Sequence, residues 1–328
     1  VPSGASTGRA EAVELRDGDP RRYRGMGCRK AVGSIHGVLS DALTSRSFGQ
    51  QYELDRALIE LDGTPDKSRL GANALLAVSI AFARAVAEEN KLPLYQQFAH
   101  ILGQLLRSLP RPTINLFSGG KHAGGQVSIQ DVLVVPLAAR TMDEALAMTF
   151  NVYQAAAGLI YRKYGMRNLT ADEGGLAPSF PGNEAMLEDA VESIRLAGLV
   201  PGQDVAVAVD VASSHFYSDG YYHLGDKVLN GEVMIEHLLG WLERYPIVSI
   251  EDGLAEEDWS HWSELRTRIG RRALVVGDDL LCTNVQRIRR AIAIGAANTL
   301  LLKVNQIGTL TEAAEACTLA RSAGWNIT

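Results

Sequence analysis

Apolar residues recur with two different periods along the chain. Up to residue 108 the pattern is mostly helical behind an opening Gly/Ser stretch, and its clearest segment, 71–90, carries apolar side chains at every third or fourth position. Beyond Pro110, short apolar runs alternate with longer amphipathic segments. This change of period predicts two domains, a mostly helical one at 1–108 and one of alternating strands and helices at 109–328.

The second region has the pattern of a parallel sheet covered by helices. Strands are expected at 113–117, 131–136, 205–212, 247–253, 274–280, 299–306 and 325–328, and helices at 141–164, 183–198, 231–244, 258–269, 284–294 and 309–323. Two helices have start signals, because Thr141 and Glu144 have capping-box spacing and Asn284 can act as a cap. The seven expected strands are one fewer than a closed (β/α)₈ barrel requires, so we expect the closing part of a barrel to lie outside this sequence.

Charged residues follow four of the expected strands. Asp210 ends VAVAVD, Glu251 ends IVSIE, Asp278 follows LVVG, and Lys303 follows TLLL. In a parallel barrel the carboxyl ends of the strands meet at one mouth, which is where active sites are found. Three carboxylates would repel one another there unless a cation joined them, and Mg²⁺ prefers oxygen ligands of this kind. The spacing therefore predicts a magnesium site.

Each of these residues also has a simpler interpretation. An acidic residue after a strand is commonly a helix cap or a turn former, and a lysine can pack its stem at a barrel mouth while its amine stays in water. Near a divalent cation, however, like-charge repulsion lowers a lysine pKa, so that Lys303 would be a competent general base. We favour the functional interpretation because the four charged residues occupy equivalent positions.

Composition and charge narrow the function classes. The 328 residues are 46% apolar and 21% charged, with a formal net charge of −6, which is typical of a globular protein and argues against a general basic field for nucleic acid. Three dispersed cysteines without a CxxC pair favour a reducing compartment over a disulfide framework. The longest apolar region, 72–83, is shorter than the roughly 20 residues that a membrane span needs.

Long motifs in chain order then point to a family. VPSGASTG, EAVELRDGD, LDGTPDKSRLGANALLAVS, GGKHAGG, ADEGG, SIEDGLAEEDW, GDDLLCTN and LLLKVNQIGTLTEA together resemble the enolase family. The resemblance implies a small N-terminal α+β domain followed by an enolase-type (β/α)₈ barrel whose first units depart from plain βα order. It also implies Mg²⁺ as cofactor, a cytoplasmic location and a homodimer or larger assembly.

The resemblance further implies a reaction, the reversible dehydration of 2-phosphoglycerate to phosphoenolpyruvate, and a role for individual residues. Lys303 matches the base that removes the C2 proton, and Glu173 matches the acid that helps the C3 hydroxyl leave. Asp131 assists the dehydration. The remaining matches are the metal ligands Asp210, Glu251 and Asp278, the substrate-binding residues His122 and Gln130, and Ser6, which contacts both substrate and a second Mg²⁺.

The sequence departs from the family pattern at two positions near these residues. Asp131 stands where a glutamate is usual, which shortens the reach of the carboxylate by about 1.5 Å, one C–C bond. His215 likewise replaces a glutamate, and Lys121 precedes His122 where the family varies. The phosphate-binding SHRSGE segment of the family is expected beyond Thr328, as is a second active-site lysine.

These departures keep two alternatives open. One is a divergent lyase of the enolase superfamily that acts on another carboxylate substrate, which Asp131 and His215 motivate. The other is an enolase-like protein of weak activity with a binding or structural role. The presence of all three ligand positions and of the base argues against this last alternative.

Overall fold

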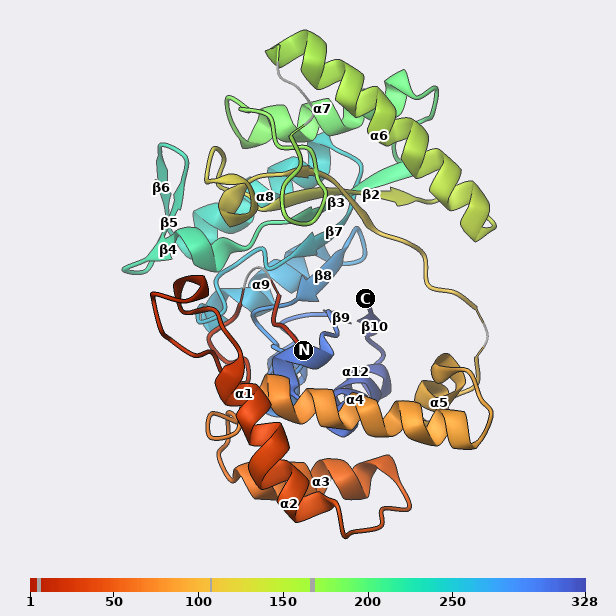
Figure 1. The fold of residues 1–328 in the computed structure, drawn as a ribbon. Helices are drawn as coiled ribbons and strands as arrows, with labels where there is room; N and C mark the ends of the chain where they lie inside the picture. Colours follow the sequence, from red (N-terminus) through yellow and green to blue (C-terminus); the bar gives the residue numbers. More distant parts are fainter. Residues whose placement is uncertain (5–6, 107, 166–168) are drawn as a thin grey trace. The chain divides into compact units, whose positions relative to one another are not determined.

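The computed structural model describes residues 1–4, 7–106, 108–165 and 169–328. They divide into two compact units, each described by itself below (Figure 1). Unit 1 comprises Val1–Arg107, Leu281–Ile292 and Leu300–Thr328, and unit 2 comprises Ser108–Leu280 and Ala293–Thr299. Ser6, to which the resemblance gives a role, lies outside the described residues. Within the described part of the chain, no helix is both long enough and apolar enough to cross a membrane.

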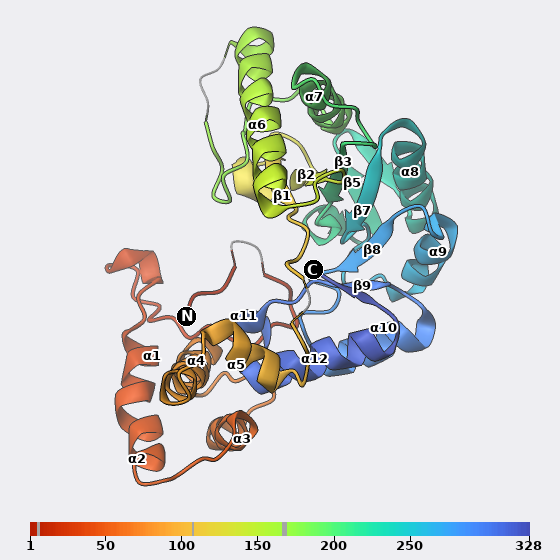
Figure 2. The same cartoon turned by 90° about the vertical axis from the view of Figure 1, so that its right-hand side faces the viewer.

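Unit 1 is built of helices, as the 3.6-residue period predicts. They are α1 (Arg29–Ser34), the π-helical segment Ile35–Leu39, α2 (Ser40–Leu43), α3 (Gln51–Asp62), α4 (Ala72–Glu89), α5 (Leu94–Ile101), α10 (Val285–Ile294, of which the part up to Ile292 belongs to this unit), α11 (Val304–Ile307) and α12 (Leu310–Ser322). Leu39, Leu58 and Leu75 are almost completely buried in its core. The central helix α4 packs on α3, α11 and α12 (Figure 2).

Buried polar contacts hold the start of α12 in unit 1. The Asp55 carboxylate on α3 accepts hydrogen bonds from the backbone N–H and the hydroxyl of Thr311, at 2.9 and 2.7 Å. Lys67 is only 2% exposed and forms an ion pair with Glu312, with 2.9 Å between Nζ and Oε1. Because helix N-termini leave unpaired N–H groups, the bond to Asp55 satisfies one of them in the first turn of α12.

Unit 2 contains a sheet whose first five strands follow the order β1-β2-β3-β7-β8. Their bounds are β1 (Ile114–Ser118), β2 (Asp131–Pro136), β3 (Val205–Asp210), β7 (Ile247–Glu251) and β8 (Leu274–Gly277). The strand β2 is antiparallel to both of its neighbours, whereas β3, β7 and β8 are mutually parallel. This confirms a barrel-type sheet whose first units depart from plain βα order. All six residues of β3 are buried, as expected for a strand covered on both faces.

Helices lie beside this sheet in unit 2, close to the bounds that the sequence predicts. They are α6 (Met142–Tyr164), α7 (Asn183–Leu196), α8 (Gly231–Arg244) and α9 (Trp259–Ile269) (Figure 2). Both start signals are confirmed. Thr141 and Glu144 form a reciprocal capping box, and the Asn284 side chain accepts from the N–H of Gln286 at 2.9 Å in the first turn of α10.

One local prediction was wrong, and one small sheet was not predicted. The run 299–306 was expected to be one strand, but β9 covers only Thr299–Leu300 and α11 starts at Val304. The N–H of Lys303 donates to the hydroxyl of Thr283, so this residue leaves the sheet. The antiparallel sheet of β4 (Tyr217–Ser218), β5 (Tyr221–Leu224) and β6 (Lys227–Leu229) was missed, although Asp219-Gly220, with positive φ at both residues, is a typical hairpin signal. The last strand, β10 (Asn326–Ile327), lies within the expected run 325–328.

Candidate active site

Strand register aligns four polar side chains in one row across unit 2. Ser118 of β1 is paired with Asp131 of β2, Asp131 with Asp210 of β3, and Asp210 with Glu251 of β7. Because β2 runs in the opposite direction, its first residue lies level with the last residues of its neighbours. The strand pairing thus places the carboxylates of Asp210 and Glu251 side by side at the ends of their strands, as the sequence predicts.

A closed series of contacts surrounds the buried Asp131. Its Oδ1 accepts from the Ser118 hydroxyl at 2.5 Å, and its Oδ2 lies 2.8 Å from Nδ1 of His122, in the 3₁₀ helix Gly120–Ala123. The other ring nitrogen of His122 lies 4.0 Å from Oε1 of Glu173. The second oxygen of Glu173 accepts from the Asn115 amide at 3.0 Å. The series therefore begins and ends on β1.

The pKa values of His122 and Asp131 are both raised. The hydrogen bond to the Asp131 carboxylate raises the pKa of His122 against the opposing effect of burial. Burial raises the pKa of Asp131, and this desolvation outweighs the lowering by the hydrogen bonds from His122 and Ser118. The two groups are joined by one hydrogen bond, along which a proton can move from one to the other. The other ring nitrogen of His122 lies 4.0 Å from the exposed Glu173, farther than a direct hydrogen bond reaches.

The structure also brings Gln130 and Asp210 together. The Gln130 amide donates to Oδ2 of Asp210 at 2.9 Å, and the backbone N–H of Ala212 donates to Oδ1 at 3.0 Å. Both side chains are buried. Gln130 is thus a residue that orients the Asp210 carboxylate in unit 2, and its expected contact with substrate stays a prediction.

A second buried acidic group centres on Asp252, which we had not selected from the sequence. Its two carboxylate oxygens accept from the backbone N–H groups of Asp278, at 3.0 Å, and Asp279, at 2.7 Å. Oxygens of these three residues lie within 4.8 Å of one another. Burial raises the pKa of Asp252 well above its ordinary value, and Asp279, Asp278 and Asp210 raise it further. The signal in the sequence that could have pointed to Asp252 was its position directly after Glu251.

This accumulation of buried negative charge fits a divalent cation. Asp210, Glu251 and Asp278 supply carboxylate oxygens, the donors that Mg²⁺ prefers, and Asp252 holds the backbone of Asp278. The repulsion that raises the pKa of Asp252 is what a bound cation would offset. The predicted ligand set stays a prediction, and the group of acidic oxygens found close together among the described residues here comprises Asp252, Asp278 and Asp279.

His215 lies in the short helix Ser213–Phe216 of unit 2 and is uncharged at neutral pH. Burial lowers its pKa to about 4, and Lys121 and His122 lower it further. A neutral imidazole therefore occupies the position at which the family resemblance expects a negatively charged glutamate. This difference in charge distinguishes the chain from the family pattern next to His122.

In unit 1, the backbone of Lys303 is held by neighbours from two segments. Its N–H donates to Oγ1 of Thr283 at 2.9 Å, and its carbonyl accepts from the backbone N–H of Gln306 at 3.0 Å. The side chain is half-buried and starts directly before α11. Sequence reasoning missed Thr283, for which GDDLLCTN offered no periodic signal.

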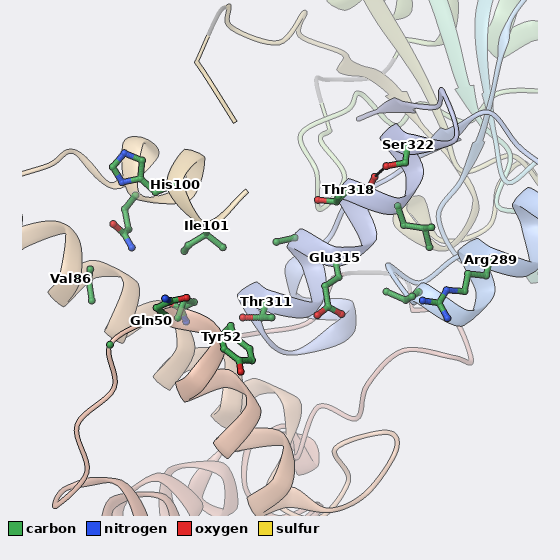
Figure 3. Close-up of a pocket in the computed structure, with 16 residues that line it drawn as sticks. Gln50, Tyr52, Val86, His100, Ile101, Arg289, Thr311, Glu315, Thr318 and Ser322 are labelled. Atoms are coloured by element: carbon green, nitrogen blue, oxygen red, sulfur yellow. Dashed lines mark hydrogen bonds between the residues drawn. The ribbon is translucent and has the colours of Figure 1, made fainter. Parts of the chain in front are cut away.

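Unit 1 also contains a cavity of about 870 Å³ (Figure 3). Side chains of α3, α5, α10 and α12 line it, among them Tyr52, His100, Arg289 and Glu315. None of the residues that line it was given a role by the sequence analysis or by the resemblance. Its basic, acidic and hydroxyl side chains do not converge on one point. We assign no function to it.

Comparison with known families covers most of the chain. Residues 106–328 match the family model described as "Enolase, C-terminal TIM barrel domain". Residues 1–98 match the model described as "Enolase, N-terminal domain". The two matches follow the order in which the sequence motifs occur.

Proposed function

Because the chain belongs to the enolase family, we propose that it is a Mg²⁺-dependent lyase that interconverts 2-phosphoglycerate and phosphoenolpyruvate. The observation that carries this proposal is the polar row of unit 2, in which strand register aligns Asp131, Asp210 and Glu251. Family membership by itself supports the coarser statement of an enolase-superfamily lyase with a carboxylate substrate. A cytoplasmic location and an assembly of two or more copies belong to the same proposal.

The proposed reaction needs a base, an acid and a way to stabilise negative charge. A proton beside a carboxylate is weakly acidic because its removal places a second negative charge on the carboxylate framework. Bound Mg²⁺ would supply electrostatic stabilisation of that charge, and Asp210, Glu251 and Asp278 are the residues that we propose to hold it. Known sites of the enolase superfamily combine a Lys or His base with one or two Mg²⁺ ions, and Lys303 in the role of base agrees with that established chemistry.

We assign the removal of the C2 proton to Lys303 and the protonation of the leaving hydroxyl to Glu173. His122 is the residue that we propose to support Glu173, because Asp131 holds one of its ring nitrogens and the other lies 4.0 Å from the Glu173 carboxylate. Gln130 keeps the Asp210 carboxylate in place. The roles of Lys303 and Glu173 rest on the resemblance of their motifs to the family.

Replacement of Lys303 tests the proposal most directly. We expect Lys303→Ala in the full-length protein to lower the rate of phosphoenolpyruvate formation by about 10² to 10⁴-fold, the usual contribution of a general base. The measurement is the absorbance of the product or a coupled assay at fixed Mg²⁺. Lys30→Ala, at an exposed lysine of α1, is the matched control and should retain activity. Unchanged activity of Lys303→Ala would contradict the assignment.

A second candidate function is dehydration of a different carboxylate substrate. It is favoured by the neutral His215 and by the short side chain of Asp131, both of which change the charge distribution near His122. Profiling of carboxylate substrates at fixed Mg²⁺ separates the two candidates. A strong preference for 2-phosphoglycerate eliminates the second one.

A further inference from the structure

Thr283 occupies an unusual position in unit 1. It is completely buried, and its φ of 51° lies in the left-handed region, where a β-branched residue is a genuine outlier. Such a conformation is unfavourable for a branched side chain and persists only where the surrounding contacts enforce it. The position therefore points to a local function of the threonine side chain.

The Thr283 hydroxyl connects both ends of the turn that carries Lys303. It accepts from the N–H of Lys303 at 2.9 Å and donates to Oε1 of Gln306 at 2.8 Å. A hydroxyl has one proton to donate and lone pairs to accept with, so the two contacts use both of its capacities. Gln306 is itself completely buried, and its backbone N–H donates to the carbonyl of Lys303.

The Gln306 backbone is fixed from a further segment of unit 1. Its carbonyl accepts from the N–H of Ala12 at 2.8 Å, and its side-chain amide lies 3.4 Å from Oε1 of Glu11. The turn from Lys303 to Gln306 is thus held at its start by Thr283 and at its end by both Thr283 and the 11–12 segment. A single hydroxyl group therefore couples the two ends of the turn.

We propose that Thr283 is a positioning residue that sets the direction of the Lys303 side chain through this hydrogen-bonded bridge. The inference rests on the proposed function, in which Lys303 is the base. Loss of the hydroxyl removes one acceptor from the N–H of Lys303 and one donor from the side-chain oxygen of Gln306. The turn then relaxes, and a displacement of the amine on the order of 1 Å can cost about a hundredfold in rate.

The test compares Thr283→Val, which keeps the branched shape and removes the hydroxyl, with Thr283→Ser, which keeps the hydroxyl. We expect Thr283→Val to lower kcat about tenfold or more with KM within about twofold, because the defect lies in the chemical step and not in binding. Thr283→Ser should restore most of the rate. Thr318→Val, at an exposed position of α12, is the matched control.

Amide hydrogen exchange at Lys303 supplies a readout that does not depend on activity. Faster exchange in Thr283→Val, but not in Thr283→Ser, is expected because the N–H loses its acceptor. Exchange that accelerates while kcat stays within about twofold of the unmodified protein would overturn the positioning role and leave the proposed function intact. If the unmodified protein has no activity that depends on Lys303, the proposed function fails instead.

A second variant serves if Thr283→Val does not fold. Gln306→Met leaves residue 283 unchanged and removes the acceptor that orients its hydroxyl. We expect this folded variant to have a lowered kcat and an accelerated amide exchange at Lys303. A kcat equal to that of the unmodified protein would overturn the proposal.

Discussion

Asp131 and Asp252 are two buried carboxylates of unit 2 whose surroundings differ in kind. Asp131 is satisfied by side chains, the hydroxyl of Ser118 and the imidazole of His122. Asp252 is satisfied by the backbone N–H groups of Asp278 and Asp279. Burial raises the pKa of both groups. The difference is that an imidazole can change its charge with pH, whereas a backbone amide cannot.

The different surroundings suggest different roles for Asp131 and Asp252. The surroundings of Asp131 include a titratable imidazole whose other nitrogen lies 4.0 Å from the proposed acid Glu173. The surroundings of Asp252 fix the path of the chain, because two successive amides point at one carboxylate. We therefore expect changes at Asp252 to alter stability and changes at Asp131 to alter titration.

The largest effect is expected for Asp252→Ala. The variant loses two hydrogen bonds and takes this acceptor away from two buried backbone N–H groups, which should lower the free energy of unfolding by about 3 kcal/mol. Urea denaturation at neutral pH measures this change. Asp226→Ala, at an exposed turn between β5 and β6, should change stability by less than about 0.5 kcal/mol. An equal loss in both variants would contradict the anchoring role of Asp252.

A smaller effect is expected for Ser118→Ala. The variant removes one hydrogen bond to Asp131 and keeps the contact with His122, so we expect a loss of about 1.5 kcal/mol in the free energy of unfolding. The pKa of Asp131 should rise further, because one group that lowers it is gone. Denaturation over a pH series would detect both changes. An unchanged pKa of Asp131 would show that the carboxylate does not depend on Ser118.

The smallest change in stability, and the clearest in titration, is expected for Asp131→Asn. The pKa of His122 should fall, because its raised value comes first from the hydrogen bond to the Asp131 carboxylate. A histidine whose pKa is raised by folding stabilises the protein below the unfolded pKa of about 6.5, and this contribution disappears as pH rises through the folded pKa. The stability difference between the two proteins should thus shrink above that window.

Titration of the His122 ring protons by NMR checks this prediction directly. His237, on α8, has a pKa that is lowered mainly by burial, and it is an internal control in the same spectra. An unchanged His122 pKa in Asp131→Asn would mean that the Asp131 carboxylate does not raise it.

The sequence was sufficient to predict the features that depend on long repeated patterns. The starts of β3, β7 and β8 were placed correctly because buried parallel strands are continuous apolar runs, whereas the expected runs extended two to three residues beyond the observed ends. The start of α6 was predictable because its cap is local, involving only Thr141 and Glu144.

Other features depend on contacts between distant segments, which periodicity does not report. Lys303 leaves the expected strand because a hydroxyl twenty positions earlier accepts its N–H. Likewise, Asp252 gains its role from amides of a different strand end, 26 and 27 positions later. The sheet of β4 to β6 escaped prediction because its strands have two to four residues, too few for an alternation to appear.

A β-bulge in β1 determines whether Asn115 and Ser118 can both take part in the contacts around Asp131. Asn115 and Ser118 are three positions apart, and an odd interval in a regular strand places side chains on opposite faces. The bulge between Asn115 and Phe117 changes this count, since the partners of Asn115 and Ser118 on β2, Leu133 and Asp131, are only two positions apart. A regular strand with the same three-position spacing would direct Asn115 and Ser118 to opposite faces, and they could then not serve Glu173 and Asp131 from one face.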